Sequence, residues 1–208
     1  MSHTFYNLIY SEDLPDSYFA EWSHEDIELE GIKCTIDEGH QRAGRRLSDL
    51  TVILRTPKVL EFDFIWTWMS EPLINERVIK IFKENKLTGY SLRPVTIKRI
   101  KRFKGNLSTI PKFWELVITG KGGYAHPNSG IKLKDECKAC GSKTYSAYEH
   151  GIIVDEKNWD GSDFFRIIEW PRILVIEKVK QIIENYKITN VELIPSQDLK
   201  WPEGVIKP

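Results

Sequence analysis

The chain contains an internal repeat, and this repeat constrains its fold more than any other sequence feature. The segments LINERVIKIFKENKLTGYSLRP (Leu73–Pro94) and LVIEKVKQIIENYKITNVELIP (Leu174–Pro195) align without gaps at a constant offset of 101 residues. The identical pairs are Leu73/Leu174, Glu76/Glu177, Val78/Val179, Ile81/Ile182, Lys86/Lys187, Thr88/Thr189, Leu92/Leu193 and Pro94/Pro195. Unrelated amphipathic segments can match by chance, but a gapless match over this length favours an internal duplication.

Both copies of the repeat predict the same helix–strand unit. Apolar residues recur at spacings of three and four, as on one face of an amphipathic helix. These residues are Ile74, Val78, Ile81 and Phe82 in the first copy and Val175, Val179, Ile182 and Ile183 in the second. We expect the helices to end near residues 85–86 and 186–187, with a short strand after each. Pro94 and Pro195 should then close their strands or lie at a sheet edge, because proline cannot donate a ladder hydrogen bond.

The remaining apolar segments complete a prediction of the fold class. Further strands are expected at Leu50–Thr56, Val95–Ile100 and Trp114–Gly120. Together with repeat units at about 60–100 and 163–196, they predict an α+β fold with two related helix–strand lobes around one mixed or antiparallel sheet system. A length of 208 residues with 41% hydrophobic residues suits one domain spanning 1–208.

The sequence also predicts where the protein resides. No apolar run reaches the roughly 18 residues that span a bilayer. The first residues, MSHTFYNLIYSEDLPD, lack the basic and apolar regions of a secretory signal. Three cysteines that include one close pair do not form a secreted disulfide framework. We therefore expect a cytoplasmic protein without membrane association.

The stretch ECKACG indicates half of a zinc site, because tetrahedral zinc is commonly bound by two such thiolate pairs. Gly141 allows the backbone turn that a zinc knuckle requires. A second Cys-x-x-Cys cannot exist, since the chain has only three cysteines. The stretch KCTIDEGHQR, however, places Cys34 and His40 in one loop. We predict that Cys34, His40, Cys137 and Cys140 bind a structural Zn(2+), with no position open for water.

Other interpretations of these residues remain open. Cys137 and Cys140 could be ordinary reduced cysteines, or a redox pair. Redox pairs usually open a helix, which Gly141 opposes. His126 or His150 could replace His40 as the fourth ligand.

The motifs resemble those of the double-CxxCG-motif family of bacterial proteins, many of which are identified as immunity proteins of contact-dependent or polymorphic toxin systems. The resemblance covers most of the chain and rests on GIKCTIDEGHQR, ECKACG, WDGSDFFRI and ILVIEKVKQIIENYKITNVELIP. The family has an early and a late Cys-x-x-Cys. Here the late motif is intact, whereas Asp37 replaces the second cysteine of the early one, which leaves His40, or else Asp37, to complete the set. The resemblance implies a soluble, non-enzymatic protein that binds and neutralises a cognate toxin of the same strain.

No set of residues predicts an enzyme. The stretch GKGG (Gly120–Gly123) lacks the Lys-Ser/Thr ending of a phosphate-binding loop. The stretch DEKNWDGSD carries Asp155, Glu156, Asp160 and Asp163, which could bind Mg²⁺ or act as acid–base groups, but Asp-Gly first indicates a turn. A hydrolase that these patterns do not reveal stays a minor alternative.

Charge is unevenly distributed although the net charge is zero. The stretch Glu12–Glu30 is acidic and carries Tyr18, Phe19 and Trp22, so it could contact a basic toxin, although a solvated segment explains it more simply. The stretch Arg93–Lys104 is basic, as in a protected edge strand or a nucleic-acid groove. The expected function is an immunity protein whose partner is a cognate toxin. The alternative is a zinc-containing nucleic-acid-binding or regulatory adaptor, and no feature predicts an oligomeric state.

Overall fold

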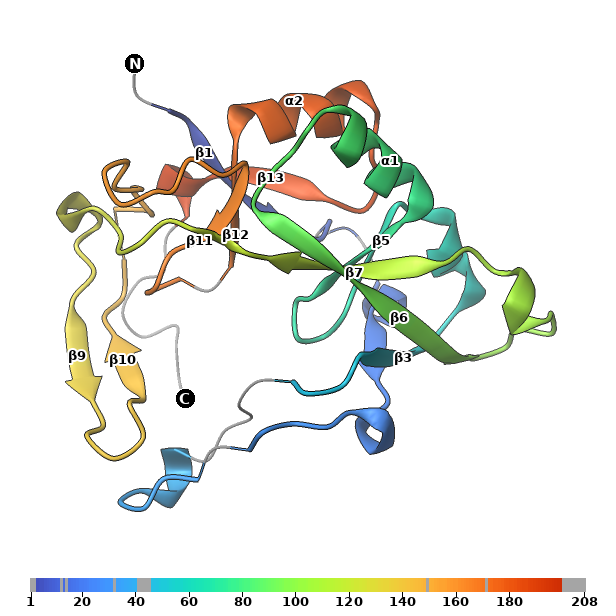
Figure 1. Ribbon diagram of the computed structural model, residues 1–208, viewed down its shortest axis with the longest axis horizontal. Coiled ribbons are helices and arrows are strands. Elements are labelled where there is room, and N and C mark those ends of the chain that lie inside the picture. Colours follow the sequence, from blue (N-terminus) through green and yellow to red (C-terminus); the bar gives the residue numbers. More distant parts are fainter. Residues whose placement is uncertain are drawn as a thin grey trace.

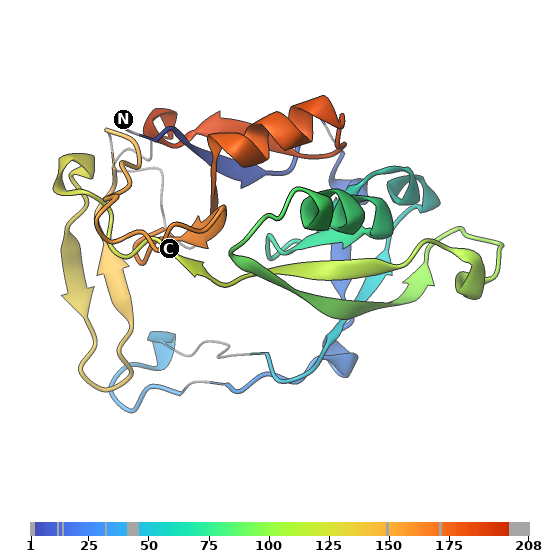
Figure 2. The ribbon, with the colours of Figure 1, turned by 45° about the horizontal axis from the view of Figure 1, so that its top comes forward.

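Two α-helices lie side by side over two large β-sheets (Figures 1 and 2). This computed structural model describes residues 3–11, 13, 15–31, 33–40, 46–148, 150–170 and 172–199. The helices are α1 (Glu76–Glu84) and α2 (Glu177–Asn185). The described residues thus form a mixed α+β structure with more strand than helix, which confirms the predicted class.

The strands form two large sheets and one hairpin in the described part of the chain, where the sequence predicted a single sheet system. The six-stranded sheet has the order β2 (Ala20–Trp22), β3 (Leu50–Leu54), β6 (Tyr90–Ile100), β7 (Phe113–Ile118), β5 (Pro72–Asn75) and β4 (Phe64–Trp66). The five-stranded sheet has the order β13 (Glu192–Pro195), β1 (Phe5–Ile9), β12 (Ile173–Ile176), β11 (Phe164–Arg166) and β8 (Gly120–Lys121). The hairpin consists of β9 (Leu133–Glu136) and β10 (Lys143–Tyr145). Each large sheet is mixed, with one parallel pair: β3 with β6 and β8 with β11.

Seven short 3-10 helices connect these elements within the described residues. They are η1 (Asp16–Tyr18), η2 (His24–Asp26), η3 (Glu38–His40), η4 (Pro57–Glu61), η5 (Leu107–Thr109), η6 (Pro127–Ser129) and η7 (Ser196–Asp198).

The two copies of the repeat adopt the same local structure. Strand β5 and helix α1 have the bounds of β12 and α2 when 101 is added to each residue number. Both helices end at a lysine with positive φ, Lys86 (52°) and Lys187 (49°). The following amide, of Leu87 or Ile188, donates at 3.0 Å to the carbonyl of Phe82 or Ile183. This bond is typical of the Schellman motif, which ends a helix by reversing the chain.

Each helix unit is completed by a strand from outside the repeat, which follows the unit in the first case and lies near the start of the chain in the second. Strand β1 lies between β12 and β13, and β7 lies between β5 and β6. Asn7 faces Leu174 and Ile194. Glu115 faces Leu73 and Arg93, which lie 101 positions earlier than those two residues. FYNLI (5–9) and FWELV (113–117) therefore occupy equivalent places in the two sheets, a correspondence that the repeat search missed.

Two aspartates link the helix units reciprocally. Asp63 Oδ2 accepts from the amide of Thr189 at 3.1 Å, and Asp163 Oδ2 accepts from the amide of Thr88 at 2.7 Å. In both places the threonine hydroxyl accepts from the aspartate amide, at 2.9 and 3.1 Å. Each unit thus stabilises the turn that follows the helix of the other. Both helices contribute to one apolar core, with Val78 and Phe82 from α1 and Val179 and Ile183 from α2.

The predicted ends of several strands were wrong. Pro195 does end β13, but Pro94 lies within β6. Pro94 is tolerated there because it lies where the partner of β6 changes, from β7 up to residue 94 to β3 from residue 95. Gly120 begins β8, where its lack of a side chain allows close approach to β11: a Cβ at this position would lie 2.1 Å from the carbonyl oxygen of Phe164. In the described residues, no helix has the length and apolar character needed to cross a membrane.

Candidate metal centre

The candidate metal centre joins a long arm of the chain to the β9–β10 hairpin. The arm comprises residues 28–31, 33–40 and 46–48. The two ends of the arm meet at a β-bridge between Leu29 and Arg46. Beside this bridge the Leu47 amide donates to the Glu28 carbonyl at 2.9 Å. From this base the arm extends to the turn of the hairpin, as Figures 1 and 2 show.

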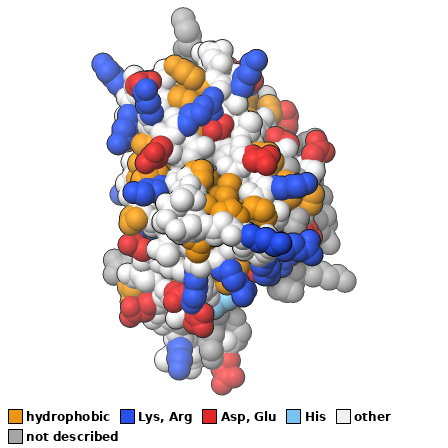
Figure 3. All heavy atoms as spheres, turned by 90° about the vertical axis from the view of Figure 1, so that its right-hand side faces the viewer, with side chains coloured by type: hydrophobic (Ala, Val, Ile, Leu, Met, Phe, Trp, Pro, Cys, Tyr) orange, Lys and Arg blue, Asp and Glu red, His pale blue; other side chains and the backbone are white. Residues whose placement is uncertain are grey.

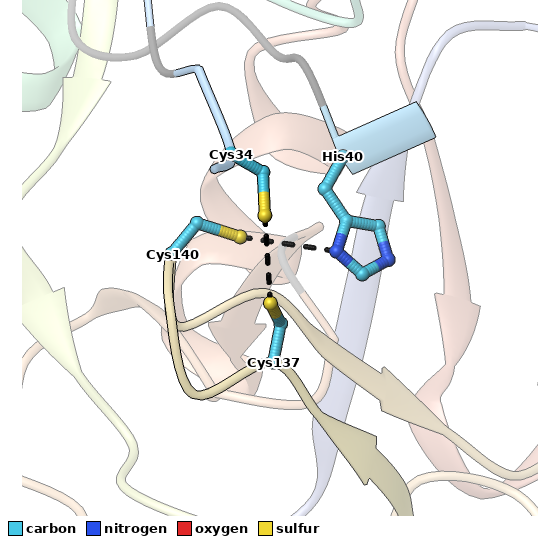
Figure 4. Close-up of side chains that lie close together, drawn as sticks. All are labelled: Cys34, His40, Cys137 and Cys140. Atoms are coloured by element: carbon cyan, nitrogen blue, oxygen red, sulfur yellow. Dashed lines mark hydrogen bonds between the residues drawn. The ribbon is translucent and has the colours of Figure 1, made fainter. Parts of the chain in front are cut away.

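All four residues predicted as ligands lie together at this contact. Cys34 and His40 come from the arm, and Cys137 and Cys140 from the turn between β9 and β10 (Figure 4). Their potential ligand atoms all lie within 4.8 Å of one another, a group that could hold a metal ion. All three cysteines are free thiols. The side chains point toward a common centre, although the two pairs are about a hundred residues apart in the chain.

The distances are those of a four-coordinate ion. Cys34 Sγ lies 3.6 Å from Cys137 Sγ, and Cys140 Sγ lies 3.9 Å from His40 Nδ1. A tetrahedron with Zn–S bonds of about 2.3 Å has S–S edges of about 3.8 Å. A disulfide bond would bring the sulfurs to about 2.05 Å. The spacing of Cys34 and Cys137 therefore suits thiolates that share an ion and is too long for a disulfide between these two cysteines.

Backbone amides favour negative charge on two of the sulfurs. The amides of Cys140 and Ala139, together with His40, lower the pKa of the Cys137 thiol to about 6. The amides of Asp37 and Ile36, 3.4 and 3.5 Å from Cys34 Sγ, lower the pKa of that thiol as well. Hydrogen bonds to a thiolate stabilise its charged form. Both sulfurs are thus prepared as ligands by the fold of their own loops.

The sulfurs of Cys137 and Cys34 raise the pKa of the two remaining groups, the Cys140 thiol and the His40 imidazole. The Ser142 amide lowers the pKa of Cys140, but burial and the sulfurs of Cys137 and Cys34 raise it further, so its net pKa is raised. The same two sulfurs raise the pKa of His40. A cluster of thiolates repels further negative charge, and a cation at its centre would relieve this repulsion.

The sequence did not reveal the role of Asp37. Its carboxylate Oδ2 lies 3.4 Å from His40 Nε2, the ring nitrogen that points away from the sulfurs. A carboxylate at this nitrogen fixes the tautomer and orientation of a ligating histidine. The spacing Asp37-x-x-His40 is the signal, since Asp37 directly precedes η3 and the His40 amide donates back to its carbonyl at 3.0 Å. Asp37, the alternative to His40 as a ligand, thus contacts His40 and is not one of the four clustered side chains.

The alternative histidines lie in other environments. His126 caps η6, where its Nδ1 accepts from the Asn128 amide at 3.2 Å. His150 is exposed, and its ring lies near Gly130. Neither belongs to the group of possible ligands found among the described residues.

The two other motifs considered for chemistry are occupied by local hydrogen bonds. In GKGG, the amides of Gly120, Lys121 and Gly122 donate to protein oxygens at 3.1, 2.8 and 2.8 Å, so they are not directed at a phosphate. The acidic side chains of DEKNWDGSD accept from donors in neighbouring turns and strands. These pairs are Asp155 with Asn158, Glu156 with His3, Asp160 with Ser162, and Asp163 with Thr88.

The acidic and basic stretches pair with each other. Lys98 Nζ lies 2.5 Å from Glu25 and 2.6 Å from Asp26, and Lys101 Nζ lies 3.2 Å from Glu21. On the face in Figure 3, Lys and Arg side chains are interspersed with Asp and Glu side chains. Part of the basic stretch is therefore neutralised by the acidic one.

The aromatic residues of the acidic stretch contribute to the core. Phe19 is buried and stacks on Trp68 with ring centroids 4.8 Å apart. Trp22 is half-buried and donates to Glu71 at 2.7 Å. Phe19 is therefore not accessible as an anchor for a partner. Glu12, at the start of this stretch, lies outside the described residues.

Comparison with known proteins does not assign a role to this site. No family model matches the chain, and no curated protein shows a significant match to it.

Proposed function

We propose that this protein is a non-enzymatic immunity protein that binds and neutralises a cognate bacterial toxin, and that a structural zinc ion shapes its binding surface. The cluster of three sulfurs and one imidazole is the observation that supports the metal. Such a donor set selects zinc among common biological cations. With four protein ligands the ion has no open position for a substrate or an activated water, so its role is structural.

Burial around the cluster supports a stabilising role for the ion. Cys34 is 9% exposed, whereas residues 35–38 beside it are exposed. All four residues of β9 are exposed as well. The tip of the arm and the hairpin thus bury little apolar surface, so little else would hold them together. In such a structure the free energy of metal binding is largely the free energy of folding.

The arm is the surface that we assign to the toxin. It carries three exposed apolar side chains: Ile36 (75% exposed), Leu47 (48%) and Leu29 (36%). Exposed apolar residues that a rigid frame holds in place are typical of binding surfaces. The zinc ion would fix the shape of this surface and so reduce the entropy lost on binding. The immunity role itself rests on the motifs that resemble the double-CxxCG family.

We also propose that the two lobes arose by internal duplication and that each contributes one knuckle to the zinc site. The equivalent bounds of the helix units, the equivalent places of β1 and β7, and the reciprocal aspartates support this origin. The sulfurs of Cys34 and Cys137 support it too, because amides two and three residues further on act on both. The first knuckle carries Asp37 where the second carries Cys140, and His40 would supply the missing ligand.

The chemistry of the site favours the cytoplasm, where thiols stay reduced. The adaptor alternative depends on the basic stretch and receives less support, because acidic side chains already pair with Lys98 and Lys101. It would require nucleic-acid binding that weakens steeply with salt. A flat gel-shift titration removes it.

Binding to the product of an adjacent toxin gene tests the proposal. We expect a complex that survives gel filtration and abolishes the toxin's activity at equimolar ratio. Ile36→Asp should weaken the complex at least about tenfold, as expected for an anchor residue. Ile168→Asp, at a residue of 51% exposure outside the arm, is the matched control and should leave binding unchanged. Absence of a complex at micromolar concentrations would contradict the proposal.

A further inference from the structure

A large cleft lies between the two sheets, at the base of the arm. Its volume is about 640 Å³, within the range of roughly 300–1,000 Å³ that is usual for small-molecule sites. Both sheets line it, and Leu29 and Arg46 of the arm contribute to its wall. Neither the metal nor the proposed toxin contact accounts for this cleft.

The cleft lies where equivalent positions of the two lobes face each other. Three such pairs among its lining residues are Leu8/Leu116, Trp66/Arg166 and Glu71/Arg172. The registers of β1 with β7 and of β4 with β11 define these equivalences. One pair is leucine in both lobes. The other two pairs differ in charge, because the second lobe has arginine where the first has tryptophan or glutamate.

Positive charge exceeds negative charge in the cleft. Its described lining includes four arginines and two glutamates. Arg46 is paired with both glutamates, Glu71 and Glu115. The guanidinium groups of Arg93 and Arg166 form no hydrogen bond or ion pair with the part of the chain that the structure describes. A guanidinium without a hydrogen-bonded acceptor favours binding of an anion.

The electrostatics of the cleft agree with partial desolvation. Desolvation lowers the pKa of Arg166, and the nearby carboxylates of Glu115 and Glu71 offset this effect only in part. Burial likewise raises the pKa of Glu115, against the lowering effect of Arg46. Arg166 is nevertheless exposed and Arg93 half-buried, so both guanidinium groups are accessible to an anion that enters the cleft.

Apolar and aromatic surface lies next to these arginines. Trp68 and Met69, which are 47% and 65% exposed, line the cleft, whereas Trp66 of β4 is 2% exposed and adds only an edge to its wall. The cleft thus offers guanidinium groups together with flat apolar surface. This combination suits a ligand with an oxyanion at one end and a planar ring at the other.

We propose that the cleft is a binding site for a small aromatic oxyanion, whose phosphate or carboxylate group pairs with Arg93 and Arg166 and whose ring packs against Trp68 and Met69. This site adjoins the proposed toxin contact at Leu29, but Arg93 and Arg166 lie outside the arm, so neither proposal depends on the other.

Isothermal titration of the full-length, metal-loaded protein tests the site, with tryptophan fluorescence as a second readout. Adenosine 5′-monophosphate is the phosphate probe and indole-3-acetate the carboxylate probe, and adenosine and indole are their neutral controls. We expect saturable binding of at least one anion below about 1 mM, with neutral controls at least about tenfold weaker. Which anion binds identifies the source of the oxyanion.

Two variants distinguish the cleft from general charge effects. Arg93→Gln combined with Arg166→Gln should weaken binding at least about tenfold, since both charge-assisted contacts to the oxyanion would be lost. Arg99→Gln, which removes an exposed charge from the same strand as Arg93, should change binding less than about twofold. Circular dichroism confirms that the variants fold.

Three results would overturn the proposal: no saturable binding of either anion, equal binding of the neutral controls, or no effect of the double variant on binding. Preferential binding of a glutamate-rich peptide over both probes would assign the cleft to a protein partner and would also overturn it.

Discussion

The reciprocal aspartates give the sharpest prediction about folding, because each should stabilise the protein by a similar amount. In Asp163→Ala, the Thr88 amide and hydroxyl lose an acceptor at 2.7 and 2.9 Å. Hydrogen bonds to a charged group contribute about 1.5–3 kcal/mol each. Thr88 is exposed, so its donors regain water and the lower value applies to both bonds. The half-exposed Lys178, 3.4 Å from Asp163, adds less than about 1 kcal/mol.

Asp163→Ala should therefore lower the free energy of unfolding by about 3 kcal/mol. Asp63→Ala should lower it by a similar or larger amount, because Asp63 also accepts from Asn75 at 3.1 Å and from Arg77 at 2.6 Å. Such a loss is a large part of the roughly 5–15 kcal/mol that stabilises a typical domain.

Urea denaturation followed by tryptophan fluorescence measures both losses, provided that the m-values stay unchanged. Asp135→Ala, at an exposed residue of β9, is the control and should cost less than about 0.5 kcal/mol. A loss below about 1 kcal/mol for either core variant would refute the view that these aspartates hold the two lobes together.

Three further predictions concern the metal site and the turns between the lobes. His40→Ala should lose zinc on gel filtration, whereas His126→Ala should retain it, as elemental analysis would show. In metal-free protein, Cys137, whose pKa is about 6, should react with iodoacetamide as a thiolate at neutral pH and more slowly below pH 6. An ordinary thiol has a pKa of about 8.5, so the stability from this thiolate is fully present above that value and is lost as pH falls through about 6. Equal reactivity at pH 5 and pH 7 would contradict this. Gly89→Ala should lower the melting temperature much more than Gly161→Ala. Both glycines have similar φ angles, 84° and 82°, but only at Gly89 would a Cβ meet a backbone oxygen, at 2.0 Å. Equal shifts would show that the close approach of the two lobes at this turn does not matter.

The helix units could be predicted because their signals are local. The spacing of apolar residues indicates which face of each helix is buried. The gapless repeat indicates that both helices end in the same way, at Lys86 and at Lys187. The cluster of three cysteines and one histidine could be predicted for another reason: few soft donors exist in this chain. With three cysteines and five histidines, a closed site has few possible compositions.

Long-range pairing was not predictable from such local signals. Strand β1 belongs to the second helix unit and β7 to the first, and no local pattern specifies which sheet a strand joins. The similarity of FYNLI and FWELV carried this information, but the strands are short and their offset differs from that of the helices. The pairing of Lys98 with Glu25 and Asp26 also depends on the order of strands β2, β3 and β6. The cleft depends on both sheets at once, so the sequence did not single out its arginines, apart from Arg93 in the basic stretch.

The central claim is that one zinc ion closes the arm onto the hairpin. Metal analysis combined with X-ray absorption at the zinc edge, on protein purified without chelators, tests it most directly. We predict one zinc per chain, with three sulfurs at about 2.3 Å and one nitrogen at about 2.0 Å. Protein that is folded but contains no stoichiometric metal, or a zinc shell with fewer than three sulfurs, would contradict it.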